Sequence, residues 1–336
     1  MSIAFLTEHV RFPWQRQLTD RPLQAGVDRF TFNRIDADCK FLVVYDDIAA
    51  GISVDIPRER RFVVLSEPPG IKAYRPAYLR QFGTVIGPVA PNVAPAERAG
   101  LRWMQTHAAL PWFYGIGFLD GACVPNLSFE QLAAMPPPPK KQTVSVVISA
   151  KTRLPMHRQR LAFVEALKQC LGERLQVFGT GFTRVPDKAD AIAPHAYHLV
   201  LENNDVDHFW TEKTADALLG WSLPLFSGCR NLDQYFPDQA FIRIDPGDSA
   251  SAVAQVERIL SEQPYDARLP AIAEARQRLI NRHELGTLLR EATQSVAHGT
   301  PELNQAPALL RANRDLGPAG KWEPFARSIA RRLLQR

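Results

Sequence analysis

The sequence lacks the apolar segments that would place a chain in a membrane or direct it out of the cell. Its 336 residues contain no apolar run long enough for a transmembrane helix. The first residues, MSIAFLTEHVRF, show no basic stretch followed by an apolar stretch and a small-residue cleavage site. These absences exclude an integral membrane protein and predict no secretion signal, so we expect a cytoplasmic protein.

Cysteine is also scarce. The four cysteines, Cys39, Cys123, Cys170 and Cys229, lie far apart and form no CxxC pair. This spacing argues against a zinc site and against a disulfide framework. We therefore expect reduced and mostly buried thiols.

The chain also lacks a basic stripe along its body. Residues 321–336, KWEPFARSIARRLLQR, carry five basic side chains and one acidic one, which is +4 of the total formal charge of +5. The remaining +1 argues against a surface that follows a nucleic-acid backbone. In this tail Phe325, Ile329 and Leu333 share one helical face beside arginines, a pattern typical of an interfacial helix. It predicts peripheral membrane contact, with docking of the helix on the protein as the alternative.

The composition is that of a folded protein with more than one domain. Hydrophobic residues make up 46% and charged residues 22% of the chain, and this length suits two domains. Four consecutive prolines open PPPPKKQ and cannot belong to a helix or a central strand. We therefore predict an N-terminal domain at 1–135, a linker at 136–142, a C-terminal domain at 143–300 and a tail at 301–336.

Apolar runs alternate with helical patterns in the predicted C-terminal domain. The runs TVSVVIS, LQVFGTG, YHLVLEN, SLPLFSG and FIRID are separated by helical patterns at 160–171, 211–219 and 250–260. This order predicts an α/β fold whose parallel sheet is covered on both faces. IAFL, FLVVYDD, RRFVVLSEPP and GTVIGP suggest a similar sheet before the linker. Ligands of such sheets bind at the carboxyl ends of the strands.

The most informative segment covers residues 197–245. A buried strand ends at Glu202-Asn203, and Thr211, Glu212 and Lys213 open a helix whose free N–H groups favour an anion. Lysine is disfavoured in a first helical turn, so Lys213 is better explained by an external anion such as phosphate. The alternative is a capping Thr211 followed by solvated charges.

This segment resembles the signature of glycosyltransferase family ten, the α-1,3/1,4-fucosyltransferases. Upstream, VVISAKTRLPMHRQRLAFVEAL resembles the family's strand, loop and R-x-x-F-V-x-x-L helix, and the resemblance covers about residues 143–245. The matching residues are Arg160, Glu202-Asn203, Thr211-Glu212-Lys213, Leu223-Pro224-Leu225, Gly228, Pro237 and Phe241-Ile242.

The resemblance implies GT-B architecture, with two Rossmann-like doubly wound domains facing across a cleft, and an inverting mechanism. It implies a GDP-sugar donor whose diphosphate is neutralised by Arg160 and Lys213, while Asn203 and Glu212 fix the ribose and phosphate region. Glu202, Phe209 and Thr211 complete the implied donor-binding set. Because two cations can stabilise the leaving group, we expect no metal and no further cofactor.

Several positions depart from the family pattern near the sugar end of the implied site. Leu201 stands for the usual Phe, Asn204 for Ser, Phe209 for Tyr and Trp210 for Val. Phe209 lacks the hydroxyl that a tyrosine could offer to the donor. Transfer of a sugar other than fucose therefore stays open.

A D-x-D motif offers a competing interpretation, since Asp205 and Asp207 could hold a metal ion as in a different transferase architecture. Three residues make a weak motif, and this one lies in the variable loop between the matched blocks. We therefore expect two solvated loop acids.

The N-terminal half provides a candidate catalytic base. Glu67, in VVLSEPPG, occupies the place of the family's E-x-P motif after a strand, and LPWFYG at 110–115 is similar to an aromatic family segment. An inverting transfer needs a carboxylate or histidine on the acceptor side. We predict Glu67 in this role, with Asp46 and Asp47 as alternatives. His107 and His195 are expected to be structural.

The leading hypothesis is therefore an inverting transferase that moves a sugar, with fucose as the leading candidate, to a hydroxyl group of a glycan or glycolipid. We expect it to act in surface polysaccharide or lipopolysaccharide synthesis, at the inner face of the membrane. A catalytically silent carbohydrate-binding scaffold is the second hypothesis. The argument against it is the joint presence of Arg160, Glu202, Asn203, Glu212 and Lys213. A membrane or nucleic-acid adaptor working through the basic tail is the third.

Overall fold

The computed structural model describes residues 2–18, 29–68, 71–88, 100–119, 122–150, 155–297 and 307–316. The chain divides into two compact units. The first unit contains residues 1–110, 120–122 and 284–336, and the second contains 111–119 and 123–283. The basic tail at 321–336 lies outside the described residues.

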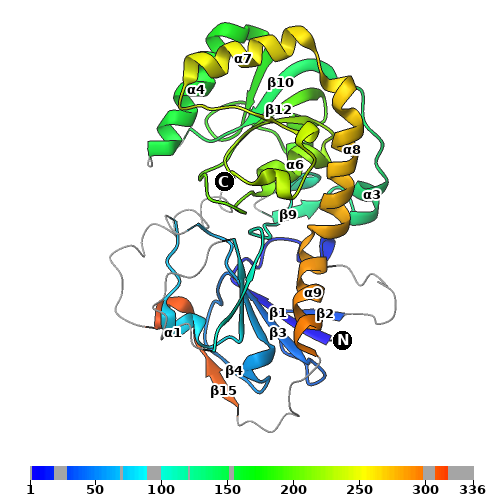
Figure 1. The fold of residues 1–336 in the computed structure, drawn as a ribbon. Helices are drawn as coiled ribbons and strands as arrows, with labels where there is room; N and C mark the ends of the chain where they lie inside the picture. Colours follow the sequence, from blue (N-terminus) through cyan, green and yellow to red (C-terminus); the bar gives the residue numbers. More distant parts are fainter. Residues whose placement is uncertain are drawn as a thin grey trace. The chain divides into compact units, whose positions relative to one another are not determined.

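The first unit is built on a six-stranded sheet in the order β2-β1-β3-β5-β6-β7, in which every neighbouring pair is parallel (Figure 1). Its strands are β1 (Ser2–Thr7), β2 (Arg29–Phe32), β3 (Phe41–Tyr45), β5 (Arg61–Val64), β6 (Thr84–Gly87) and β7 (Arg102–Gln105). The central strands β1, β3 and β5 are buried along their whole length. Such continuous apolar runs are typical of parallel strands that are covered on both faces.

The C-terminal end of the described chain completes the core of this unit. β15 (Ala308–Leu310) pairs antiparallel with β4 (Ile52–Val54). Leu310 and Ala312 are fully buried in one cluster with Leu42 and Val63 of the sheet and with Tyr78 of α1 (Pro76–Leu79). α9 (Leu285–Ala297) also belongs to this unit.

The second unit contains a five-stranded parallel sheet in the order β11-β10-β12-β13-β14. Its strands are β10 (Lys141–Val147), β11 (Leu175–Phe178), β12 (His195–Leu201), β13 (Leu223–Ser227) and β14 (Ile242–Arg243). A separate two-stranded sheet pairs β8 (Ile116–Leu119) with β9 (Ala122–Pro125).

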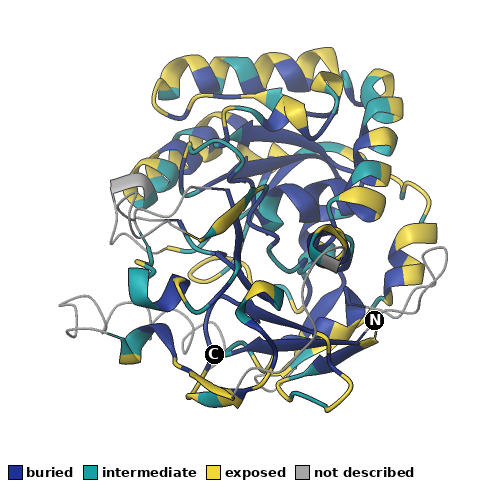
Figure 2. Cartoon of the chain, turned by 60° about the horizontal axis from the view of Figure 1, so that its bottom comes forward, coloured by how far each residue is buried: buried dark blue, intermediate teal, exposed yellow. Residues whose placement is uncertain are grey.

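Helices cover both faces of the second sheet. The helices are α3 (Phe129–Ala134), α4 (Pro155–Leu171), α5 (Lys188–Ile192), α6 (Glu212–Leu219), α7 (Ser249–Glu262) and α8 (Tyr265–Arg282). Leu199 and Leu201 of β12 pack in one cluster with α4 and α7, whereas Val200 between them packs in another with α6 and α8. This alternation is the period of two expected for a strand. Figure 2 shows the buried strands in dark blue and the outer helix faces in yellow.

No helix in the described part of the chain is both long and apolar enough to cross a membrane.

The division between the units falls at other positions than the sequence suggests. The proline-rich segment 136–142 lies within the second unit, because residues ahead of it already belong to that unit's core. Trp112, Tyr114 and Phe129 are buried in the cluster formed by α6 and α8. From Glu284 onwards, the chain again belongs to the first unit.

Candidate active site

The carboxyl edge of the second sheet brings several chain segments close together. Two glycines make this approach possible. A Cβ atom on Gly179, after β11, would lie 2.1 Å from the carbonyl oxygen of Ile148, after β10. A Cβ atom on Gly228, after β13, would lie 2.5 Å from Cβ of Glu202, after β12. Both glycines have positive φ, at +119° and +149°, which side chains disfavour. The loops at this edge are therefore closely packed.

Glu202 is buried at this edge and fixes the start of α6. Its carboxylate accepts hydrogen bonds from the backbone N–H of Thr211 (2.8 Å), the Thr211 hydroxyl (2.7 Å) and the Thr214 hydroxyl (3.2 Å). Thr211 in turn caps the helix by accepting from the N–H of Lys213. Burial raises the pKa of Glu202, although the nearby Lys213 charge opposes this. The carboxylate therefore holds the helix N-terminus in one place.

Lys213 lies beside two carboxylates. Its Nζ is 3.0 Å from Oε1 of Glu212 and 3.6 Å from Oε2 of Glu202. Burial acts to lower its pKa, but the charges of Glu212 and Glu202 outweigh this and raise the pKa to about 12. Burial likewise acts to raise the pKa of Glu212, but Lys213 outweighs it and lowers the pKa to about 2. The lysine is a permanent cation, with its side chain 24% exposed.

Arg160 and Asn203 lie at the same edge, and each carries a buried polar atom that no described residue pairs with. Arg160 on α4 donates from Nη1 to the carbonyl oxygen of Leu201 (2.9 Å), the last residue of β12. In the part of the chain that the structure describes, its buried Nε has no hydrogen-bond partner, and the same holds for Oδ1 of Asn203. Burial lowers the pKa of Arg160, and the charges of Glu202 and Glu212 act against this. Buried polar atoms without partners are uncommon, and a bound ligand is one explanation for them.

Five of the predicted donor-binding residues thus interact with one another through hydrogen bonds or charges, and Asn203 lies next to Glu202 after the end of β12. The five are Arg160, Glu202, Thr211, Glu212 and Lys213. Phe209 differs, because its side chain is only 2% exposed and lies in the interior. The hydroxyl group that a tyrosine would carry at this position would therefore lie inside the core.

Sequence reasoning missed the residues that hold the loop before α6. His208 has a left-handed backbone, with φ at 65°, and its Nδ1 lies 2.8 Å from the Tyr235 hydroxyl. Its backbone N–H donates to Oδ1 of Asn231 (2.7 Å). Trp210 packs edge-on against Tyr235 and His283. Only the cluster of aromatic residues and histidines in the sequence signals this packing.

The two aspartates of the D-x-D motif lie apart from this cluster of charges. Asp205 is exposed, and Asp207 pairs with Arg230 at 3.1 Å. In the part of the chain that the structure describes, neither belongs to a group of three side chains able to hold a metal ion.

The carboxyl edge of the first sheet contains the predicted base. Glu67 lies three residues after β5 and is partly buried, and its backbone N–H donates to the Tyr74 hydroxyl (3.3 Å). Asp46 and Asp47, the alternatives, are 3% and 4% exposed. Asp46 accepts hydrogen bonds from Tyr74 and Lys72 (2.5 and 2.8 Å), and Asp47 accepts from two backbone N–H groups. Both aspartates therefore bind groups within the protein.

Two histidines that the sequence suggested to be structural are buried. Nδ1 of His107 accepts from the backbone N–H of Ala109 (3.0 Å), and Nδ1 of His195 lies 2.7 Å from the Thr143 hydroxyl.

Comparison with known proteins identifies the class. Two crystal structures of alpha1,3-fucosyltransferase resemble the whole chain. One, with GDP, has a TM-score of 0.51 and 14% identity and covers 89% of this chain and 91% of its own. The other has a TM-score of 0.50 and 13% identity and covers 92% of both. With its two parallel α/β units, the chain has the GT-B fold.

The family follows from the sequence of the second unit. Residues 137–266 match the description "Glycosyltransferase family 10 (fucosyltransferase) C-term". This segment contains every predicted donor-binding residue. It is a C-terminal domain of glycosyltransferase family 10, and the chain is a glycosyltransferase.

Proposed function

We propose that this chain transfers fucose from GDP-fucose to a hydroxyl group of a glycan, with inversion at the anomeric carbon. The family 10 domain supports the sugar, and a similar solved structure described as alpha1,3-fucosyltransferase with GDP supports the nucleotide. We further propose a glycan or glycolipid acceptor in surface polysaccharide or lipopolysaccharide synthesis, on the cytoplasmic side of the membrane, with the basic tail as a peripheral contact.

The observation that carries this proposal is the charge arrangement at the start of α6. Arg160 offers a buried N–H that has no hydrogen-bond partner in the described part of the chain, and Lys213 is a permanent cation in the first turn of α6. These groups suit the two phosphates of GDP. As the bond between the sugar and the diphosphate breaks, negative charge grows on the leaving oxygen, and the same groups stabilise it.

The acceptor side of the reaction needs a proton acceptor, which we propose to be Glu67. The acceptor oxygen attacks the anomeric carbon from the face opposite the diphosphate. A new carbon–oxygen bond forms, the bond to the diphosphate breaks, and the acceptor proton passes to the carboxylate of Glu67. GDP then leaves with the bonding electron pair. No metal ion is required for these steps, since Arg160 and Lys213 supply the positive charge.

The test is a donor screen that measures nucleotide release with GDP-sugars and with UDP-sugars as controls. We expect GDP-fucose to give the fastest release, and we expect the rate to persist in EDTA. Release from UDP-sugars alone would contradict the proposal. Complete loss in EDTA, with recovery on adding manganese, would instead make Asp205 and Asp207 metal ligands.

One observation favours a second donor. Trp210, where the resemblance implies Val, is buried within the aromatic group around Tyr235, so a larger side chain fills the core directly before Thr211. The alternative is a family-ten-like transferase for another GDP-sugar, which the same screen would identify. A silent carbohydrate-binding scaffold would release nucleotide from none of the donors.

A further inference from the structure

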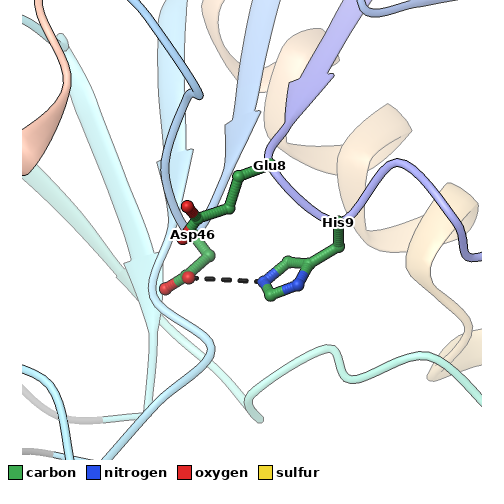
Figure 3. Close-up of side chains that lie close together, drawn as sticks. All are labelled: Glu8, His9 and Asp46. Atoms are coloured by element: carbon green, nitrogen blue, oxygen red, sulfur yellow. Dashed lines mark hydrogen bonds and ion pairs between the residues drawn. The ribbon is translucent and has the colours of Figure 1, made fainter. Parts of the chain in front are cut away.

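His9 and Asp46 form a pair at the carboxyl edge of the first sheet. His9 follows β1 by two residues and Asp46 follows β3 directly, and these two strands are neighbours. Nε2 of His9 lies 3.4 Å from Oδ2 of Asp46 (Figure 3). Ligands of open parallel sheets bind at this edge.

Asp46 is held firmly, and it therefore fixes the histidine. Its two carboxylate oxygens also accept hydrogen bonds from the Tyr74 hydroxyl (2.5 Å) and the Lys72 ammonium (2.8 Å). With Nε2 directed at this carboxylate, the imidazole has one orientation and carries a proton on Nε2. Burial acts to lower the pKa of His9, but the Asp46 carboxylate outweighs this and raises the pKa. Nδ1 of His9 accepts a hydrogen bond when the ring is neutral and donates one when it is protonated, and it has no hydrogen-bond partner in the described part of the chain.

A metal ion does not fit this cluster, although Glu8, His9 and Asp46 lie close enough to bind one. The Nζ atom of Lys72 is 2.8 Å from Asp46, 3.6 Å from Glu8 and 3.7 Å from Asp47. The ammonium group therefore already contacts all three carboxylates, and a metal cation would be repelled by it.

Only two members of the cluster are accessible to a ligand. The side chains of Glu8 and His9 are each 33% exposed, whereas those of Asp46, Asp47 and Lys72 are 4%, 6% and 14% exposed. An incoming molecule therefore meets an imidazole nitrogen beside a carboxylate. These groups suit the hydroxyl groups of a sugar, and the carboxylate repels an acidic ligand.

We propose that His9, positioned by Asp46, binds a hydroxyl group of the acceptor sugar, and that Glu8 beside it restricts the acceptor to sugars without acidic groups. This inference rests on the proposed function, because it assigns the acceptor of that transfer. It adds to Glu67 a binding residue on another strand of the same sheet edge.

The first experiment uses a panel of neutral saccharides and their carboxylated counterparts as acceptors, with GDP-fucose as donor. We expect neutral saccharides alone to stimulate GDP release. Stimulation by carboxylated members alone, or by none of the panel, would overturn the proposal. Calorimetric binding of GDP-fucose to the same protein separates the two hypotheses, because its absence would instead reject the donor assignment.

The second experiment uses His9→Gln, whose side-chain amide can still donate to Asp46 but does not present a hydrogen-bonding nitrogen at the position of Nδ1. With the best neutral acceptor, we expect its KM to rise roughly threefold to tenfold, as for one lost hydrogen bond. The Kd for GDP-fucose and the melting temperature should stay unchanged. Val10→Ala, at the exposed neighbouring residue, is the matched control and should leave the KM unchanged.

The outcomes of the second experiment decide the role of His9. An unchanged acceptor KM in His9→Gln would reject it, and an equal rise in Val10→Ala would show that any change in this loop has the effect. Glu8→Gln should narrow the difference in KM between neutral and carboxylated acceptors. If that difference stays the same, Glu8 does not select the acceptor.

Discussion

At the scale of single residues, the charges around the start of α6 balance before any ligand is bound. Glu202 and Glu212 contribute two negative charges, and Arg160 and Lys213 contribute two positive ones. Lys213 contacts both carboxylates, whereas Arg160 donates its hydrogen bond to a backbone carbonyl oxygen. Arg160 is therefore less engaged with other side chains than Lys213 is, and is more available to bind a diphosphate.

This difference predicts distinct outcomes for two substitutions. Arg160→Ala and Lys213→Ala should each weaken GDP binding by roughly 1.5 to 3 kcal/mol, the usual loss for a charged hydrogen bond. Only Lys213→Ala should also lower the melting temperature, because it leaves Glu202 and Glu212 without their cation. Calorimetry and thermal unfolding measure both effects. Arg258→Ala, an exposed cation on α7, is the control. GDP affinity that is unchanged in both variants would reject the site.

Glu67 is tested by a substitution that keeps its shape. Glu67→Gln cannot take a proton from the acceptor, so kcat should fall roughly 10²-fold or more while GDP-fucose binding is retained. Glu59→Gln is the control, because Glu59 is exposed and precedes the amino end of the same strand, β5. Turnover near the normal rate in Glu67→Gln would contradict its role as the base.

At the scale of elements, the start of α6 is held by a loop that needs a glycine. Glu202 binds both Thr211 and Thr214, and the turn after β13 passes directly against Glu202 at Gly228. The candidate site is therefore rigid because β12, β13 and α6 are packed together at their ends. A side chain on Gly228 would push Glu202 out of position.

Two glycine substitutions distinguish the effect of the close contact with Glu202 from the effect of a positive φ on a residue with a side chain. In Gly228→Ala the new Cβ would meet Glu202 within 2.6 Å, at φ +149°. Gly172→Ala also imposes a positive φ, of +56°, but its Cβ would meet nothing within 4 Å. We expect Gly172→Ala to lower the free energy of unfolding by about 1 kcal/mol and Gly228→Ala by about 3 kcal/mol or more. Denaturant titrations that give equal losses would show that the contact with Glu202 does not matter.

At the scale of the whole molecule, the second unit contains histidines that are buried without charge. Burial lowers the pKa of His198 to about 3 and those of His195 and His283 to about 4. Unfolding restores an ordinary pKa near 6.5. Between these values the unfolded chain binds more protons than the folded one, so stability falls as the pH falls.

We therefore expect the free energy of unfolding to decrease as the pH is lowered from about 6.5 towards 4. His198→Asn keeps a hydrogen-bonding group near Ser145, the partner of His198, but removes this ionisation. Its unfolding free energy should depend less steeply on pH, by about 1.4 kcal/mol per pH unit, the value for one proton. Denaturant titrations at pH 7, 6 and 5 measure the slope. The same slope in wild type and variant would contradict the neutral state of His198.

Much of the second unit could be predicted from its sequence, because each buried strand there ends in a clear polar turn. The strands β10 to β14 and the helices α4, α6 and α7 lie where the apolar patterns place them. α8 was missed, since Pro270 interrupts its pattern although the helix continues through it. Proline removes one N–H but does not end a helix whose other contacts are strong.

The site residues could be predicted only as a group. Glu202 and Lys213 share a sequence motif, but the motif does not reveal that Glu202 is fully engaged with α6 or that Phe209 points inward. The predicted linker at 136–142 does not coincide with the unit boundary, because Trp112 and Tyr114 ahead of it pack in the core of the second unit. Their apolar character in the sequence does not indicate which of the two cores they join. Which core receives a side chain depends on contacts between distant segments, and a single sequence does not reveal them.

The return of Leu310 and Ala312 to the core of the first unit has a consequence for synthesis on the ribosome. The second unit is contained in residues 111–119 and 123–283, so all of it leaves the ribosome before these two residues do. Domains fold as units during translation as their residues emerge. The unit at the amino terminus is therefore the last to be completed, and a release of the chain before residue 310 would leave a finished second unit attached to an unfinished first one.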